Sequence, residues 1–326
     1  MATRRSLLAA AGLVAIGGPA AACAKKEPAG SGGTQAITLG FSQTGSESGW
    51  RTANTKSINE AAKAAGINLK FNDAQGKEEN QIAHIRSFIQ QKVDVISFSP
   101  LKVTGWDTVL KEAKDAKIPV ILTDRSVDVA DTSLYVCFIG SDFIDEGKRA
   151  AAMMKKVMAS ATGTVNIAQL EGSTGSAPAI ERTKGFAEAI AGDAKYKIVV
   201  SQTGEFTRAK GKEVMEAFLK AHPEINFLFA QNDDMGLGAI QAIEAAGKKP
   251  GTDVKIVAID AIKDGFVAMS EGKINGLVEC NPLLGPQLME LVKKVKAGQP
   301  VERRIVTIEK DFTQDQAAAE LPNRKY

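Results

Sequence analysis

INFLFAQNDDMGLGAIQAIEAAGKK, residues 225–249, contains the pattern that decides the fold. Its first seven residues are mostly apolar, as expected for a parallel strand that is covered on both faces. Asn232 and Asp233 follow this strand directly. The stretch 236–249 is amphipathic and ends at glycine and lysine, which is typical of a helix. The segment therefore predicts a buried strand, a polar strand end and a helix in succession.

The same succession recurs along the chain from Ile37 onwards. Apolar runs predict strands at residues 36–42, 67–73, 93–99, 118–124, 135–141, 164–170, 197–203, 225–231, 254–260 and 275–280. Amphipathic stretches predict helices at residues 55–66, 77–92, 104–117, 146–160, 179–192, 210–222 and 236–249. Such alternation indicates α/β layers built on parallel sheets. Because 326 residues exceed the usual length of one domain, we expect two doubly wound lobes.

The first 23 residues, MATRRSLLAAAGLVAIGGPAAAC, differ in composition from the rest. A basic start, an apolar stretch and small residues before Cys23 are typical of an export signal. The paired arginines, Arg4 and Arg5, resemble a twin-arginine signal, but ordinary signals also carry such pairs, so both export routes stay open. Because Ala20-Ala21-Ala22-Cys23 resembles a lipoprotein cleavage box, we expect lipidation of Cys23, with plain cleavage after Ala22 as the alternative.

The composition after the signal is that of an ordinary soluble protein. Residues 24–35 are rich in Gly, Ser, Pro and Lys, which suits a flexible tether. No later run has the 18 or so apolar residues that a membrane span requires. We therefore expect the protein in the periplasm or cell envelope, with a lipid at Cys23 as its only link to a membrane.

Charge and cysteine content exclude several classes of function. Removal of Arg4 and Arg5 with the signal lowers the formal net charge from +3 to +1, which offers no electrostatic footprint for nucleic acid. After Cys23 only Cys137 and Cys280 remain, too few for a disulfide framework, and we expect both as free thiols. With 2 His residues, Cys/His metal-site spacing is absent, so we expect no metal and no cofactor.

Polar residues gather at the predicted strand ends. In an open parallel sheet the ligand crevice lies beyond the carboxyl ends of the strands, so these side chains converge if the two sheets face one another. Turns also favour Asp, Asn and Ser for purely structural reasons. The strand ends carry Ser42, Gln43, Asp73, Ser99, Asp124, Arg125, Asp142, Glu171, Glu205, Phe206, Asn232, Asp233, Asp260 and Glu279.

Two kinds of chemistry fit this cluster. A glycosidase needs two carboxylates, which Asp233, Asp260 and Glu47 could supply. A sugar-binding site uses carboxylates as acceptors, Arg and Asn as donors, and an aromatic face against the ring. The spacing of these residues in the sequence does not distinguish a glycosidase from a sugar-binding site. A P-loop, a GxGxxG turn and a Gly-x-Ser-x-Gly elbow are absent, and His84 and His222 lie away from the strand ends, so other enzyme classes fit less well.

Several short motifs match those of a known family. They are 42–51 (SQTGSESGWR), 104–106 (TGW), 118–125 (IPVILTDR), 185–186 (GF), 206–208 (FTR), 210–215 (KGKEVM), 230–235 (AQNDDM) and 238–240 (GAI). On these motifs, from Ile37 to about Lys310, the sequence resembles the periplasmic sugar-binding proteins of ABC importers, in the ribose/galactose-binding class. Parts of it look especially like the galactofuranose-binding branch.

The resemblance implies a type I periplasmic binding protein, in which two lobes joined by three crossing segments close on one sugar. It places Trp50 against the sugar ring, and where that family often has Asn this chain has Phe143. Cys280 stands where relatives carry residues such as Gln or Leu. Together with the polar residues of the opening stretch, the expected ligand-binding residues are Ser42, Glu47, Trp50, Arg51, Asp124, Arg125, Asp142, Arg182, Phe206, Asn232 and Asp260. We expect Trp106 to be structural.

The expected organisation and role follow from this resemblance. The N-terminal lobe takes residues 36–141 and 281–306, and the C-terminal lobe takes residues 142–280 and 307–326. The protein is expected to act as a monomer that binds a monosaccharide, a furanose such as galactofuranose, and delivers it to an ABC permease without catalysing a reaction. The alternatives are a glycoside-active enzyme that uses the same cleft, and a sugar receptor that feeds a chemotaxis or sensor protein.

Overall fold

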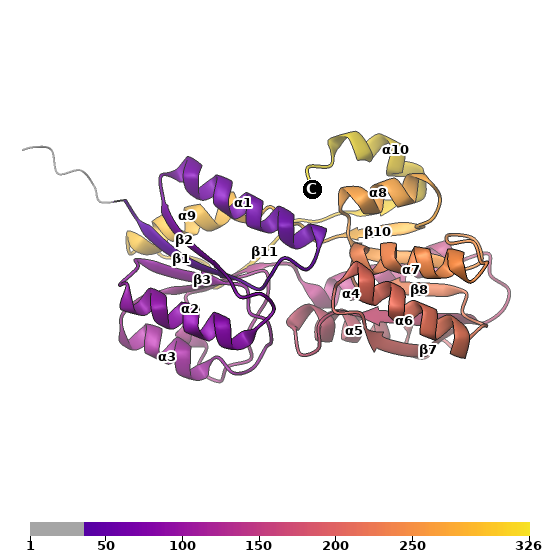
Figure 1. Ribbon diagram of the computed structural model, residues 1–326, viewed down its shortest axis with the longest axis horizontal. Coiled ribbons are helices and arrows are strands. Elements are labelled where there is room, and N and C mark those ends of the chain that lie inside the picture. Colours follow the sequence, from indigo (N-terminus) through magenta and orange to yellow (C-terminus); the bar gives the residue numbers. More distant parts are fainter. Residues whose placement is uncertain (1–35) are drawn as a thin grey trace, which may run out of the picture. The chain divides into compact units, whose positions relative to one another are not determined.

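The computed structural model describes residues 36–326, so the expected export signal, Cys23 and the tether lie outside the described residues. Two six-stranded sheets organise this part of the chain (Figure 1). Sheet A has the strand order β11-β5-β4-β3-β1-β2, and sheet B has the order β12-β10-β9-β8-β6-β7. The first five strands of each sheet follow the same winding, in which the order reverses beside the first strand. The predicted pair of doubly wound α/β lobes is confirmed.

The N-terminal lobe is built on sheet A, whose neighbouring strands are all parallel. Its strands are β1 (Thr38–Gln43), β2 (Asn68–Asp73), β3 (Val95–Phe98), β4 (Val120–Thr123), β5 (Cys137–Gly140) and β11 (Arg304–Val306). Its helices are α1 (Gly49–Ala65), α2 (Glu78–Gln90), α3 (Asp107–Asp115), the 3₁₀ turn η1 (Thr132–Leu134) and α9 (Gly285–Lys296). Leu284 and Leu288 pack with Leu39 and Ile58 in one buried cluster, which assigns α9 to this lobe.

Helix α1 begins and ends where its sequence requires. The side chain of Ser48 accepts the backbone N–H of Arg51 and so caps the first turn. Gly66 ends the helix in the left-handed region, at φ 68°, where a side chain would be strained. The N-terminal turn of α1 thereby lies directly after the polar end of β1.

The C-terminal lobe is built on sheet B, in which only the edge strand β12 runs antiparallel, beside β10. Its strands are β6 (Val165–Glu171), β7 (Tyr196–Thr203), β8 (Phe227–Ala230), β9 (Lys255–Asp260), β10 (Gly276–Glu279) and β12 (Asp311–Thr313). Its helices are α4 (Phe143–Val157), α5 (Ala177–Ile190), α6 (Arg208–Ala221), α7 (Asp233–Ala245), α8 (Lys263–Ser270), α10 (Ala317–Glu320) and the 3₁₀ turns η2 (Gln314–Gln316) and η3 (Leu321–Asn323).

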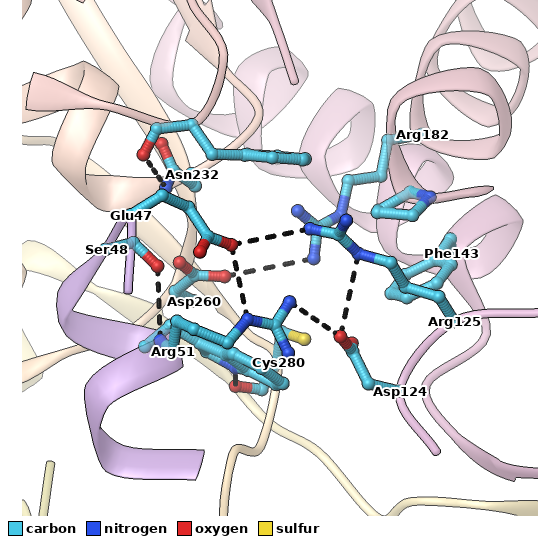
Figure 2. A pocket seen from close by; sticks show the side chains of 13 residues that line it. Glu47, Ser48, Arg51, Asp124, Arg125, Phe143, Arg182, Asn232, Asp260 and Cys280 are labelled. Carbon is cyan, nitrogen blue, oxygen red and sulfur yellow. Dashed lines mark hydrogen bonds and ion pairs between the residues drawn. The ribbon is translucent and has the colours of Figure 1, made fainter. Parts of the chain in front are cut away.

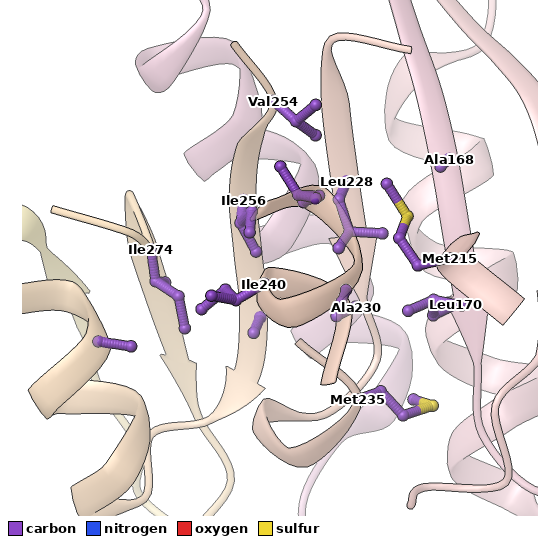
Figure 3. Close-up of a cluster of buried hydrophobic side chains, with 14 of the residues drawn as sticks. Ala168, Leu170, Met215, Leu228, Ala230, Met235, Ile240, Val254, Ile256 and Ile274 are labelled. Carbon is purple, nitrogen blue, oxygen red and sulfur yellow. The ribbon is translucent and has the colours of Figure 1, made fainter. Parts of the chain in front are cut away.

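Both faces of sheet B are covered by apolar side chains. On one face, residues of β8 and β9 such as Leu228 and Ile256 pack against Met215 of α6 and Ile240 of α7 (Figure 3). On the other face, Phe229 stacks on Phe186 of α5 with ring centroids 4.2 Å apart. Burial on both faces explains why the central strands read as continuous apolar runs.

The chain passes between the two sheets three times. It leaves sheet A after β5, returns after β10, and passes again from β11 to β12. The carboxylate of Glu309 joins these segments, because one of its oxygens accepts hydrogen bonds from Ser141 Oγ (2.5 Å), Thr307 Oγ1 (2.8 Å) and the Asn281 N–H (3.0 Å). One buried carboxylate thus fixes the spacing of all three crossings.

Helices of the described residues 36–326 are all too short or too polar to cross a membrane.

Candidate ligand-binding site

A cavity lies where the polar strand ends of both sheets meet. Figure 2 shows the side chains that line it, several of which point toward one another from different elements. The lining residues are Glu47, Ser48, Trp50, Arg51, Asp124, Arg125, Phe143, Pro178, Arg182, Phe206, Asn232, Asp260 and Cys280.

An ionic network forms the side of the cavity contributed by the N-terminal lobe (Figure 2). Arg51 lies 2.8 Å from Asp124 through Nη2 and 3.2 Å from Glu47 through Nε. Burial alone would raise the pKa of both carboxyls, but Arg51 and Arg125 outweigh burial and hold both pKa values below their usual range. Burial lowers the pKa of Arg51, but the carboxylates of Asp124 and Glu47 raise it by more, so the pKa of Arg51 lies above its usual value. The four groups therefore stay charged and present fixed acceptors and donors.

Arg125 is the least satisfied member of this network. It is 3% exposed, and its Nε has no hydrogen-bond partner among the described residues. Its nearest carboxylate oxygens, on Glu47 and Asp124, lie 3.6 Å from Nη2 and Nε respectively. Burial, and then the neighbouring Arg51, lower the pKa of Arg125 to about 10. A buried guanidinium with an unused N–H is suited to donate to a bound ligand.

Arg182 is the corresponding cation on the side of the C-terminal lobe. Its Nε donates to Glu146 at 2.7 Å, its Nη1 donates to the carbonyl oxygen of Gln231 at 2.6 Å, and its Nη2 lies 3.8 Å from Asp260. Burial, opposed by Arg182, raises the pKa of the Asp260 carboxyl well above its usual range. Asn232 gives one amide N–H to the Phe206 carbonyl oxygen, which leaves its second N–H for a ligand.

Three lining residues have a strained backbone. Asp124, Phe206 and Asp260 have φ values of 64°, 61° and 118°, where side chains other than glycine are disfavoured. Each such residue costs about 1–3 kcal/mol, and such strain clusters at ligand-binding and catalytic sites. All three lie at or shortly after the end of a strand and line the same cavity, which makes this strand-end region the candidate binding site.

Aromatic rings complete the walls. The Arg125 guanidinium lies over the ring of Phe206 at 5.4 Å, and the Arg51 guanidinium lies over the ring of Trp50 at 4.7 Å. The indole Nε1 of Trp50 donates to the carbonyl oxygen of Cys280 at 2.7 Å. Gly172 has the ring of Phe206 pressed against it, so any side chain at this position would displace that ring. The rings are therefore held in place before a ligand binds.

Most of the expected site residues line this cavity, but two do not. Ser42 is fully buried, and its Oγ lies 2.9 Å from His84 Nδ1. Asp142 is exposed and caps α4 by accepting the N–H of Asp145. Trp106 is buried against Phe98. The structure therefore does not bring Ser42 and Asp142 into the cavity, and the position of Trp106 agrees with its expected structural role.

Four lining residues were not among the expected ligand contacts: Ser48, Phe143, Pro178 and Cys280. The sequence analysis had singled out Phe143 and Cys280, because both differ from the residues that relatives carry at these positions beside the crossings. Pro178 lies in the first turn of α5, where its side chain reaches the cavity only through the tertiary arrangement.

Among residues 36–326, Glu146, Cys280 and Glu309 bring three potential metal-ligating atoms within 4.8 Å of one another. One Glu146 oxygen already accepts from Arg182, and one Glu309 oxygen accepts from the three crossings. These contacts assign the cluster to the structure of the crossings. Cys137 and Cys280 are both buried and free, as the sequence predicts.

Comparison with known proteins places this fold and site in a family. A family model described as a periplasmic binding protein domain matches residues 39–300. The chain is 47% identical over 293 residues to the galactofuranose-binding protein YtfQ of Escherichia coli, covering 89% of this chain and 92% of that protein.

Solved structures agree with this match. A Mycobacterium smegmatis protein in complex with β-D-fucofuranose has a TM-score of 0.88 and 65% identity, covering 89% of this chain and 96% of the other. The binding protein of the arabinose ABC transporter of Shewanella sp. ANA-3, bound to L-arabinofuranose, has a TM-score of 0.85 and 48% identity. The match covers 89% of this chain and 96% of that protein. Since the family model spans most of the chain and the two-lobed architecture matches, the chain belongs to the periplasmic binding protein family.

Proposed function

We propose that this protein is the extracytoplasmic solute-binding component of an ABC importer, which captures a furanose monosaccharide and delivers it to the permease. The observation that carries the proposal is the cavity between the two lobes, where charged donors and acceptors at the edges enclose aromatic faces. A sugar ring has the complementary surface, with hydroxyls at its edge and C–H groups on its faces.

The proposed ligand contacts divide between the lobes. Glu47, Arg51, Asp124 and Arg125 bind hydroxyls from the N-terminal lobe, with Trp50 beside the ring. Arg182, Asn232 and Asp260 do so from the C-terminal lobe, with Phe206 as a second aromatic face. All nine of these residues line the cavity. Ser42 and Asp142 are left out of this set because their side chains bond elsewhere.

A furanose is the proposed ring form. The relatives described above are named for galactofuranose or were crystallised with fucofuranose or arabinofuranose, and all three sugars are five-membered rings. Several further relatives are named as ribose or fructose import binding proteins, which supports the importer role over the sensor alternative.

The enzyme alternative has less support from the site. Asp233, one of its three candidate carboxylates, accepts the N–H of Ile262 and does not line the cavity. Glu47 is held ionised by Arg51 and Arg125, which suits an acceptor of hydrogen bonds and not a general acid. The relatives are named as binding proteins, and a binding role needs no reaction at this cavity.

A thermal-shift screen of monosaccharides tests the proposal. A ligand at about 100 times its dissociation constant adds about 2.7 kcal/mol to the free energy of unfolding. We expect galactofuranose, fucofuranose or arabinofuranose to raise the melting temperature and pyranose-locked methyl glycosides to leave it unchanged. Stabilisation by none of these furanoses contradicts the proposal, and release of the aglycone from an aryl furanoside would favour the enzyme.

The organisation of the whole chain is proposed on the same basis. Residues 1–23 act as the export signal, Cys23 is the lipidated residue and residues 24–35 form the tether. The N-terminal lobe comprises residues 36–141 and 281–306, and the C-terminal lobe comprises residues 142–280 and 307–326. The protein works as a monomer in the periplasm or cell envelope. Labelling with a fatty-acid analogue, compared between the native chain and Cys23→Ser, tests the anchor.

A further inference from the structure

Asp260 lines the cavity from a strained loop. It ends β9 with a φ of 118°, and Ala261 follows with a φ of 59°, so two successive residues other than glycine have positive φ. Backbone of this kind is costly and persists only where the surrounding structure holds it in place. The same backbone fixes the position of the Asp260 side chain, which lies 3.8 Å from Arg182. The contacts that hold residues 260–261 therefore also set part of the binding site.

Residues 324–326 supply two contacts to this loop. Arg324 Nη2 donates to the carbonyl oxygen of Ala261 at 2.7 Å, and the main-chain oxygen of Tyr326 accepts the N–H of Lys263 at 2.6 Å. The bond from Arg324 is charge-assisted, so it is stronger than a bond between two neutral groups. A segment 63 positions away in the sequence thus holds the strained residue that directly follows Asp260.

The guanidinium of Arg324 is itself held in place. Its side chain is 8% exposed, and the guanidinium carbon lies 4.8 Å from the ring centroid of Phe266, 5.2 Å from that of Phe312 and 4.5 Å from that of Tyr326. Aromatic rings attract the cation and restrain the planar guanidinium, which a flexible lysine would not match. Arg324 can therefore keep the Ala261 carbonyl oxygen at a fixed place.

The same guanidinium also reaches the second crossing. Arg324 Nη1 donates to Glu279 Oε1 at 2.9 Å, and the Tyr326 hydroxyl donates to the same oxygen at 2.8 Å. Glu279 ends β10 directly before the second crossing, and its other oxygen accepts the N–H of Lys310 of the third crossing at 3.1 Å. Arg324 therefore bonds the loop of Asp260 to the place where two crossings leave sheet B.

We propose that Arg324 is a positioning residue for sugar binding, which holds the strained backbone of Asp260 and Ala261 so that the Asp260 side chain lines the cavity. The inference rests on the proposed sugar-binding function and adds a residue that does not line the cavity itself. Without Arg324, residues 260–261 relax towards negative φ, and the Asp260 side chain leaves the place where it contacts the sugar.

Calorimetry with D-galactose, D-fucose and L-arabinose tests this role, with the furanose fraction of each solution measured by NMR. We expect Arg324→Ala to weaken binding of the tightest of these sugars about tenfold or more, while circular dichroism shows a folded protein. In Arg324→Lys the ammonium pairs with Glu279 and the bond to Ala261 is lost, so binding should weaken several-fold. This variant carries the same test if Arg324→Ala does not fold.

A double-mutant cycle separates positioning from a merely structural role. Asp260→Ala lacks the side chain that Arg324 is proposed to position. In that background, titrated to saturation, Arg324→Ala should weaken binding further by less than about twofold. A loss as large as in the native background would show that Arg324 acts on binding by another route, and would overturn the proposal.

Arg303→Ala is the matched control. Arg303 also donates to a carbonyl oxygen, that of Tyr135, and its guanidinium lies over the Tyr135 ring, but it does not line the cavity. It should keep native affinity. Native affinity in Arg324→Ala, or in Arg324→Lys, overturns the positioning role and leaves sugar binding intact. If the native protein binds none of the three sugars, the proposed function fails and this inference fails with it.

Discussion

Arg125 shows how a single residue can be held ready for a ligand. Its guanidinium is buried, stacks on Phe206 and carries an N–H without a partner among the described residues. Such a group costs free energy in the unliganded protein, because a buried donor loses its water and gains nothing in exchange. A sugar hydroxyl that accepts this N–H recovers that cost on binding.

We therefore expect Arg125→Ala to weaken sugar binding at least 100-fold while the protein stays folded. Each charge-assisted hydrogen bond contributes about 1.5–3 kcal/mol, and a guanidinium makes more than one. Titration calorimetry on the variant measures the loss. Arg86→Ala is the control, since Arg86 pairs with Glu112 on the exposed surface of α2 and α3 and should keep native affinity. Unchanged affinity in Arg125→Ala would remove this residue from the site.

Glu146 is a second residue whose state is set by its surroundings. Burial, opposed by Arg182, raises the pKa of Glu146 from 4.5 to about 8, and one of its oxygens has no partner. Between pH 4.5 and about pH 8 the Glu146 carboxyl is ionised in the unfolded chain but still protonated in the folded protein. The free energy of unfolding therefore falls as the pH rises through this range. Above about pH 8 both states are ionised and this contribution becomes constant.

We expect the melting temperature to decrease between about pH 5 and pH 8, and Glu146→Gln to make this decrease smaller, because glutamine cannot ionise. Burial also raises the pKa of Asp233 and Asp260, so part of the slope should remain. Melting curves over this pH range provide the measurement. Glu290→Gln, at an exposed position of α9, should reproduce the native slope. A slope identical to native in Glu146→Gln would show that this carboxyl does not carry the proton.

At the scale of elements, the N-terminus of α1 and the first turn of α7 form a contact between the lobes. The backbone N–H of Gly49 donates to Asp234 Oδ2 at 2.7 Å. Helix α1 has no acidic residue in its own first turn, so Asp234 of the other lobe supplies the negative charge that a helix N-terminus favours. Arg208 holds the same carboxylate through its other oxygen at 2.9 Å.

We expect Asp234→Ala to weaken sugar binding about fivefold without altering any residue of the cavity wall. A carboxylate at a helix N-terminus contributes about 1 kcal/mol, and here it is present only while the lobes are closed. Stopped-flow measurements should show the change mainly as faster sugar release. Asp264→Ala is the control, because Asp264 also pairs with Arg208 but does not contact Gly49. If both variants behave alike, the contact with α1 does not stabilise closure.

At the scale of the whole molecule, the site is complete only when both lobes contribute. The ligand contacts proposed here are divided between sheets A and B. Three crossings join the two sheets, and Glu309 bonds these crossings to one another. A ligand that contacts both lobes has a higher affinity for the closed state, and only this difference can shift the equilibrium between open and closed forms. Ligand binding and lobe closure are therefore expected to be one event.

We expect a saturating furanose to reduce the radius of gyration in solution scattering and to change tryptophan emission. Trp50→Phe should remove most of the emission change, since Trp50 lines the cavity, whereas Trp106→Phe should keep it, since Trp106 is buried against Phe98. Tight binding with an unchanged scattering profile would argue against closure.

The sequence by itself determines the two-lobed α/β fold, because the signals for strands and helices are local. All ten predicted strands match β1 to β10, since apolar runs and amphipathic periods are visible in short windows. The two other strands, β11 and β12, have three residues each, too few for any period to be seen. The capping role of Asp142 could also be predicted from the local sequence, because an Asp followed closely by Asp145 and Glu146 is typical of a helix N-terminus.

Only the tertiary structure decides which polar strand ends meet in the cavity. Ser42 and Gln43 are neighbours at the end of β1, yet they bond to different helices: Ser42 to His84 of α2, and Gln43 to Asn54 of α1. A strand alternates its side chains between two faces, but the packing of helices on those faces decides what each side chain meets. The same holds for Cys280 and Glu309, which reach the cavity and the crossings through contacts with residues more than 100 positions away. Such contacts leave no pattern in a local window, so the sequence predicted the kinds of residue in the site, and the three-dimensional packing selected which of them line it.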